Sequence, residues 1–143
     1  MEALMTLNCS NYSSNIIDVL QAFQQIGWGI ENSCGEVEFL PLGDNGMYEW
    51  LREEISQTKL YSIISNKIAN KEQIGINLFN DNSMEGISFI ADSTEQIILS
   101  LSINRKVIKG KYTDLVWYLE NIVYKLFDIG VDIRSYILEE YGD

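Results

Sequence analysis

The 143-residue sequence contains no histidine, and this absence removes several kinds of catalytic chemistry at once. Without imidazole there is no Ser-His-Asp or Cys-His nucleophilic system, no histidine general base and no zinc site of the usual histidine type. The two cysteines, Cys9 and Cys34, are not in CxxC spacing, and no glycine-rich phosphate-binding motif occurs. We therefore predict that the chain is not an enzyme and uses no cofactor and no metal.

Long apolar runs and a basic leader are missing as well. The longest uninterrupted apolar runs are a few residues, far short of the roughly 20 that span a bilayer. The opening residues, MEALMTLNCS, resemble no export signal. We expect no membrane association and a cytoplasmic location, where both cysteines remain reduced. The length and the 46% hydrophobic content predict a single domain over residues 1–143.

Basic residues are scarce, with 10 lysines and arginines against 21 acidic residues and a formal net charge of −11. Residues 1–58 contain nine acidic residues and one basic one, residues 128–143 contain five and one, and the middle of the chain is nearly balanced. Such a field repels nucleic acid and anionic lipid and accelerates encounter with basic surfaces. The plainer alternative is that the acidity only keeps the protein soluble.

Hydrophobic periodicity predicts an α+β fold. Alternating residues predict strands at 74–79, 86–91 and 96–103, joined by loops short enough for hairpins, which together form a three-strand antiparallel meander. One or two strands are expected nearer the N-terminus, around 4–7 and within GEVEFLPLG, residues 35–43, where Val37 and Phe39 point inward and Glu36 and Glu38 outward. Helices are predicted over 16–26, 47–55, 60–72 and 113–130, with a short terminal element after them. This order favours a mostly antiparallel sheet with helices packed on one face.

The predicted helix TDLVWYLENIVYKLFDIG, residues 113–130, has more aromatic bulk than one core-facing stripe needs. At about 100° per residue, its core face consists of Leu115, Leu119, Ile122, Leu126 and Ile129, with Val116, Val123 and Phe127 on the shoulder. Trp117 and Tyr124 lie roughly opposite, beside Asp128, where polar groups are usual. One alternative is that the C-terminal segment, with Tyr136, Ile137, Leu138 and Tyr141, covers these aromatic residues. The other is that they form an exposed protein-binding face beside Asp128, Asp132, Glu139 and Glu140.

A second candidate face combines carboxylates with one aromatic side chain. Its members are Glu36, Glu38, Asp44, Glu49, Trp50 and Glu53. Aromatic anchors among carboxylates are typical of an interface for a basic partner. A calcium-like run at 80–86 is better explained as a polar hairpin turn.

Three segments carry a resemblance to a known class of proteins: GDNGMYEWLREEI, GISFIADSTEQIILSLSI and YTDLVWYLENIVYKLFDIGVDI. In these segments, and in size and charge, the chain resembles the small acidic immunity proteins of bacterial polymorphic-toxin and contact-dependent growth inhibition systems. The resemblance implies a protein that binds one cognate toxin domain, often a basic nuclease, and blocks its active site or its access to substrate. It assigns no role to any single residue.

Two other classes share some of these properties. A nucleic-acid mimic, such as a phage inhibitor of a defence protein, would need carboxylates along a continuous stripe, which the balanced middle of the chain does not favour. A small acidic secretion chaperone would bind an extended client, as a homodimer, through the polar sheet face that includes Phe79, Ile90 and Ile98. For an inhibitor, a monomer is expected.

Overall fold

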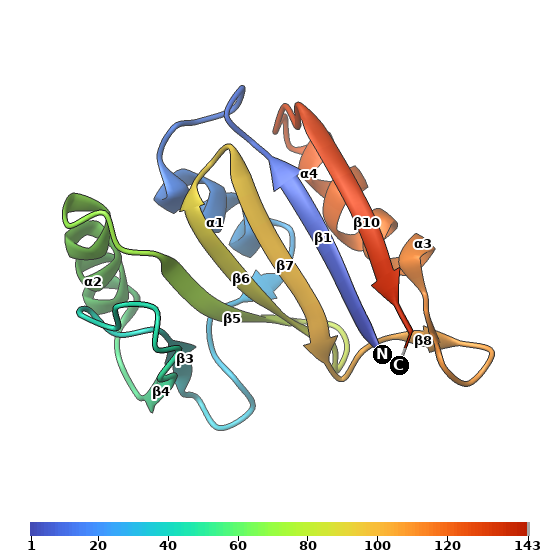
Figure 1. Ribbon diagram of the computed structural model, residues 1–143, viewed down its shortest axis with the longest axis horizontal. Helices are drawn as coiled ribbons and strands as arrows, with labels where there is room; N and C mark the ends of the chain where they lie inside the picture. Colours follow the sequence, from blue (N-terminus) through green and yellow to red (C-terminus); the bar gives the residue numbers. More distant parts are fainter. Residues whose placement is uncertain (143) are drawn as a thin grey trace.

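The computed structural model describes residues 1–142, and Asp143 lies outside the described residues. Its main feature is an eight-stranded sheet in the described part of the chain, in which every strand pair is antiparallel (Figure 1). The strands are β1 Glu2–Asn8, β2 Trp28–Gly29, β3 Val37–Phe39, β4 Leu51–Glu53, β5 Ile74–Asn80, β6 Gly86–Ser93, β7 Gln96–Ile103 and β10 Ser135–Tyr141. They lie in the order β10-β1-β7-β6-β5-β3-β4, and β2 pairs separately with β5.

The remaining elements are one small hairpin and the helices. Their bounds are β8 Val107–Ile108, β9 Tyr112–Thr113, α1 Ile16–Gln25, α2 Gln57–Ala69, α3 Leu115–Tyr118, η1 Leu119–Tyr124 and α4 Lys125–Asp128. The last three follow one another without a break and form one helix with a π-helical centre. The α+β class and the antiparallel meander β5-β6-β7 are confirmed.

One face of the sheet is covered by helices, as predicted, and the other faces solvent (Figure 1). Alternate residues of the central strands, including Met5, Phe89 and Leu99, are fully buried on the covered face. Phe23 of α1 packs edge-on against Phe89 with ring centroids 5.5 Å apart. The open face is mixed: the hydroxyls of Ser100 and Ser102 hydrogen-bond to each other there, and Ile98 lies opposite Ile90 on the same face. In the described part of the chain, no helix combines the length and the apolar character needed to cross a membrane.

The predicted helix over residues 47–55 is wrong. Its Leu51–Glu53 portion is β4, which pairs with β3. Before it, Tyr48 has a left-handed backbone with φ of 56°, and the Asp44 carboxylate accepts hydrogen bonds from the amides of Tyr48 and Glu49 at 3.0 and 2.9 Å. Helix propensities differ by only about 0.7 kcal/mol per residue, so strand pairing and these turn contacts override them.

The predicted short terminal element is a full edge strand. Strand β10 pairs with β1 over seven consecutive residues without a register shift. Its Tyr136 and Leu138 lie opposite the buried Leu7 and Met5, so they face the helices, whereas Ile137 lies opposite Thr6 on the open face. This pairing joins the two ends of the chain and places β10 beside the α3-η1-α4 helix (Figure 1).

Candidate functional site

The helix that carries the candidate site starts at an aspartate cap and contains a wide turn. The carboxylate of Asp114 accepts a hydrogen bond from the Trp117 amide at 3.1 Å. The π-helical segment Leu119–Tyr124 follows, and a π turn advances each residue by a smaller angle than an α turn does. The buried face is consequently rotated from the predicted one and is centred on Tyr118, Ile122 and Leu126.

This rotation corrects several predicted positions. Of the predicted core face, Ile122 and Leu126 are buried, Leu115 and Leu119 are half-buried, and Ile129 is exposed. Of the predicted shoulder, Val123 is buried, but Val116 and Phe127 are largely exposed.

The π segment is held in place by the fully buried Trp28. The Trp28 indole N–H donates to the carbonyl of Asn121 at 3.0 Å, and the Asn121 side-chain amide donates to the carbonyl of Trp117 at 2.8 Å. A π turn disturbs the regular helical hydrogen bonds, and these contacts provide partners for two backbone carbonyls in that region.

Trp117 belongs to the packing of this helix and not to an exposed face. It is half-buried and makes edge-to-face contacts with Trp28 and Tyr118, at centroid distances of 6.2 and 4.9 Å. The Lys106 ammonium lies 5.9 Å from the Trp117 ring centroid. Trp117 is therefore packed within the protein, but its ring contacts are with Trp28 and Tyr118 and not with the C-terminal segment that was expected to cover it.

The end of the helix reverses the chain and creates a pocket. The amide of Val131 donates to the carbonyl of Leu126, and that of Gly130 to the carbonyl of Phe127, both at 3.0 Å. Gly130 has φ of 88°, so the two bonds form a Schellman motif, with the buried Val131 and Leu126 as its usual apolar pair. The chain then returns as β10, and the space between helix and strand stays open.

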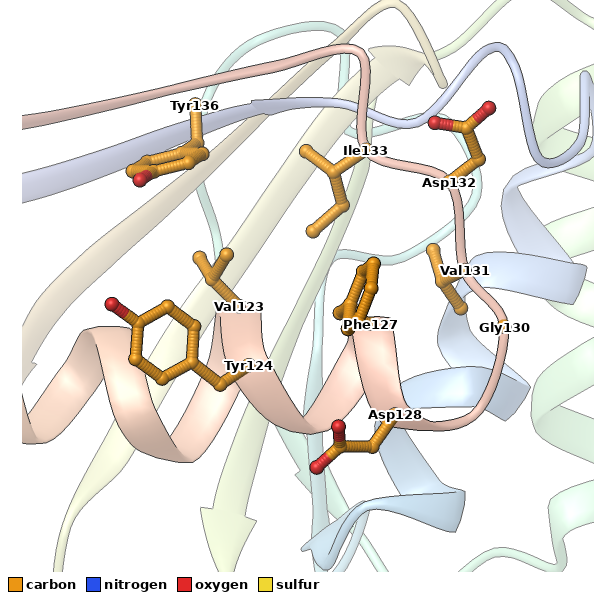
Figure 2. A pocket seen from close by; sticks show the side chains of 9 residues that line it. All are labelled: Val123, Tyr124, Phe127, Asp128, Gly130, Val131, Asp132, Ile133 and Tyr136. Atoms are coloured by element: carbon orange, nitrogen blue, oxygen red, sulfur yellow. The ribbon is translucent and has the colours of Figure 1, made fainter.

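This space is an apolar pocket of about 820 Å³. Its lining consists of Val123, Tyr124, Phe127, Asp128, Gly130, Val131, Asp132, Ile133 and Tyr136. Figure 2 shows Tyr124 and Phe127 rising from the helix on one side and Tyr136 and Ile133 on the other. Phe127 is 75% exposed, Tyr124 51% and Tyr136 47%. We call Tyr124, Phe127 and Tyr136, together with Asp128 and Asp132, the C-terminal site.

The charge around the C-terminal site is mainly negative. Asp128 and Asp132 are exposed at its rim, and neither belongs to the ion pairs found among residues 1–142. Glu140 is occupied within the fold, since its carboxylate accepts a hydrogen bond from the amide of Thr113. The free carboxylates of the rim are therefore available to cationic groups of a partner.

The second candidate face lies at the opposite edge of the sheet, around β3 and β4 (Figure 1). Its best-defined member, Glu38, accepts hydrogen bonds from Asn32 and Asn77, both at 2.8 Å, and lies 3.6 Å from Arg52. Burial raises the pKa of Glu38, but these hydrogen bonds and the Arg52 charge outweigh it, so the pKa is lowered overall. Ser88 continues the network through Asn77. The charge of Glu38 is thus already compensated within the protein.

The other members of this face differ in how far they are exposed. Asp44 is buried in its turn, and Trp50 is half-buried over Gly75. Glu49 and Glu53 are exposed, while Glu36 is half-exposed and lines a groove of about 570 Å³ with Glu38 and Arg52. The predicted site residues therefore form two separate groups, of which only Tyr124 and Asp128 lie in the apolar pocket.

Sequence reasoning missed the main contributors to the pocket. Phe127 was predicted at the shoulder of the core, Tyr136 was expected only to cover the helix, and Asp132 was placed beside it without being selected as a site residue, although all three line the pocket. The signal was present in SYILEEY, whose alternation as a strand places Tyr136 on the helix side.

Comparison of the chain with protein-family models, with curated proteins and with solved structures gives no match. Among residues 1–142, no group of three or more histidine, cysteine or acidic side chains could hold a metal ion.

Proposed function

We propose that this chain is a non-enzymatic protein of the immunity type, which binds a basic toxin domain through the C-terminal site and so neutralises it. The observation that carries the proposal is the exposed aromatic pocket beside unpaired carboxylates, within the acidic end of the chain. A nuclease toxin fits best, because a nuclease presents lysine and arginine to its substrate phosphates. In a bacterial cell, the complex would form in the cytoplasm.

Each half of the site has its own physical role in this proposal. Asp128 and Asp132 attract the partner over long range, which raises the association rate and makes it sensitive to salt. Tyr124, Phe127 and Tyr136 provide a desolvated contact that slows dissociation, because aromatic side chains are enriched among the residues that dominate binding energy. Neither role needs a catalytic group.

The test uses the product of the adjacent reading frame in the source genome, co-expressed and purified as the potential toxin. The double variant Asp128→Lys, Asp132→Lys is compared with Asp92→Lys, Glu95→Lys, which makes the same charge change at exposed positions of the β6–β7 hairpin. We expect the first pair to slow association about tenfold or more at low salt and the second pair to change it much less. Equal slowing by both pairs, or no complex with the unmodified chain, would contradict the proposal.

A further inference from the structure

Strand β10 is an unusual edge for a sheet in a free protein. In the described part of the chain it pairs only with β1, so its other side presents backbone N–H and C=O groups without a strand partner. Proteins usually protect such edges with short strands, prolines, charged side chains, especially lysine, or bulges. The opposite edge follows this rule, because β4 has only three residues. Strand β10 has seven residues, SYILEEY, contains no proline or lysine, and pairs without a bulge. Its charged residues are Glu139 and Glu140, which would favour a basic strand at this edge.

The free edge and the pocket adjoin each other. Tyr136 belongs to both, since it lies in β10 and lines the pocket. Side chains directly opposite one another in paired strands point to the same face. A residue of an added strand opposite Tyr136 would therefore point towards the helix, where Tyr124 and Phe127 lie (Figure 2).

We propose that the C-terminal site binds its partner by strand addition: an extended segment containing lysine or arginine pairs with the free edge of β10 and places an apolar side chain in the pocket. This inference rests on the proposed function for the basic character of the partner and adds the mode of binding. The backbone supplies the pairing, and the pocket selects the inserted side chain.

The charge around β10 favours a basic segment of a partner over a second copy of this chain as the strand that pairs with its edge. The edge is flanked by Asp128 and Asp132 at the pocket, and Glu139 lies on the open face of β10 opposite Leu4. No lysine or arginine lines the pocket, although Lys125 and Arg134 are close to it in the sequence. At the other end of β10, Arg105 donates to the Thr113 hydroxyl, and the Thr113 amide donates to Glu140. A second copy would bring the same acidic edge and another net charge of −11, whereas a basic segment complements both.

The probe for this test is a fluorescent peptide of sequence Lys-Val-Lys-Leu-Lys-Val-Lys, whose alternation matches a strand with one apolar face. We expect saturable binding that is lost when glutamate replaces every lysine. Two isomeric peptides separate strand addition from other modes, one N-methylated at the amides of the three apolar residues and one at the amides of the three lysines that follow them. In a paired strand, alternate N–H groups point to the same edge, so one isomer should lose binding and the other retain it.

The matched protein variants are Phe127→Ser and Val116→Ser. Both remove an exposed apolar side chain from the same helix, and only Phe127 lines the pocket. Phe127→Ser should weaken peptide binding about tenfold, and Val116→Ser should leave it unchanged. Amide hydrogen exchange should show new protection at alternate residues of β10 when the unmodified peptide is bound.

Several results would overturn strand addition. These are binding of both N-methyl isomers or of neither, absence of saturation up to about 1 mM of the unmodified peptide, or a dimer in sedimentation equilibrium that Phe127→Ser dissociates. If the adjacent gene product still forms a complex that depends on Asp128 and Asp132, the proposed function stands and only the binding mode fails. Loss of that complex would remove the function itself.

Discussion

Truncation of Phe127 should lower the free energy of unfolding much less than truncation of its neighbour Leu126. This difference tests whether the Phe127 ring is available to a partner. Full burial of a phenylalanine side chain stabilises a protein by about 1.5–3 kcal/mol. Phe127 is 75% exposed, so about a quarter of its surface is removed from water on folding. Its burial therefore contributes roughly 0.5 kcal/mol to the free energy of unfolding. Serine and phenylalanine have similar helix propensities, so Phe127→Ser should lower the unfolding free energy by no more than this.

Leu126→Ala is the matched comparison. Leu126 is fully buried and contributes to the Schellman motif, and truncation of a buried leucine costs about 2–5 kcal/mol. Urea denaturation followed by tryptophan fluorescence gives both values, since Trp28 and Trp117 lie beside this helix. In the complex the order should reverse, with Phe127→Ser weakening the affinity about tenfold to a hundredfold. A loss of more than about 2 kcal/mol for Phe127→Ser would place this ring in the core, where no partner could reach it.

Three further predictions concern parts of the structure outside the pocket. Trp28→Phe removes the indole donor to the carbonyl of Asn121 and should lower the free energy of unfolding by about 2 kcal/mol in urea denaturation, whereas no loss would show that the π segment does not need it. The pKa of Glu38 is lowered in the folded state, so its contribution to stability is present above the ordinary glutamate pKa and is lost as the pH falls through the lowered value. Glu38→Gln should therefore reduce the dependence of the unfolding free energy on pH in the acid range, and an unchanged dependence would contradict this. The exposed Cys34 should react with a thiol reagent in the native protein. Burial raises the pKa of Cys9 to about 11, so this thiol should react only after unfolding, and two reactive thiols in the native state would contradict the prediction.

Local patterns predicted the meander well. Strands 74–79, 86–91 and 96–103 alternate apolar and polar residues and are joined by short loops, so the information for each hairpin lies within a few neighbouring residues. The helix at 16–26 was also predicted, from its caps and its apolar spacing. A helix was predicted at 60–72 as well, but the structure places it at Gln57–Ala69, three residues earlier. Such features need no knowledge of distant parts of the chain.

The failures arose where distant contacts decide the structure. Residues 47–55 contain good helix formers, but pairing with β3 and the Asp44 turn give them an extended path. The helix face was misplaced because a constant step of about 100° per residue cannot represent a π turn. That turn is accompanied by the hydrogen bond from Trp28, far away in the sequence, which no local pattern reveals.

The candidate site was only partly predictable for the same reason. Tyr124 and Asp128 were selected from helix geometry, and the structure places them in the pocket. The pocket's other wall depends on the pairing of β10 with β1 at the opposite end of the chain. Charge alone could not rank the two acidic faces, whereas hydrogen bonds and burial can, because Glu38 and Asp44 are used within the fold.

Amide hydrogen exchange of the chain, alone and in complex with the adjacent gene product, shows which edge of the sheet binds the partner. We expect the partner to increase protection along β10 and the η1–α4 part of the helix, around Tyr124, Phe127 and Tyr136, and to leave β3 and β4 unchanged. Increased protection confined to residues 36–53, with none around the pocket, would contradict this expectation and assign partner binding to the opposite edge of the sheet.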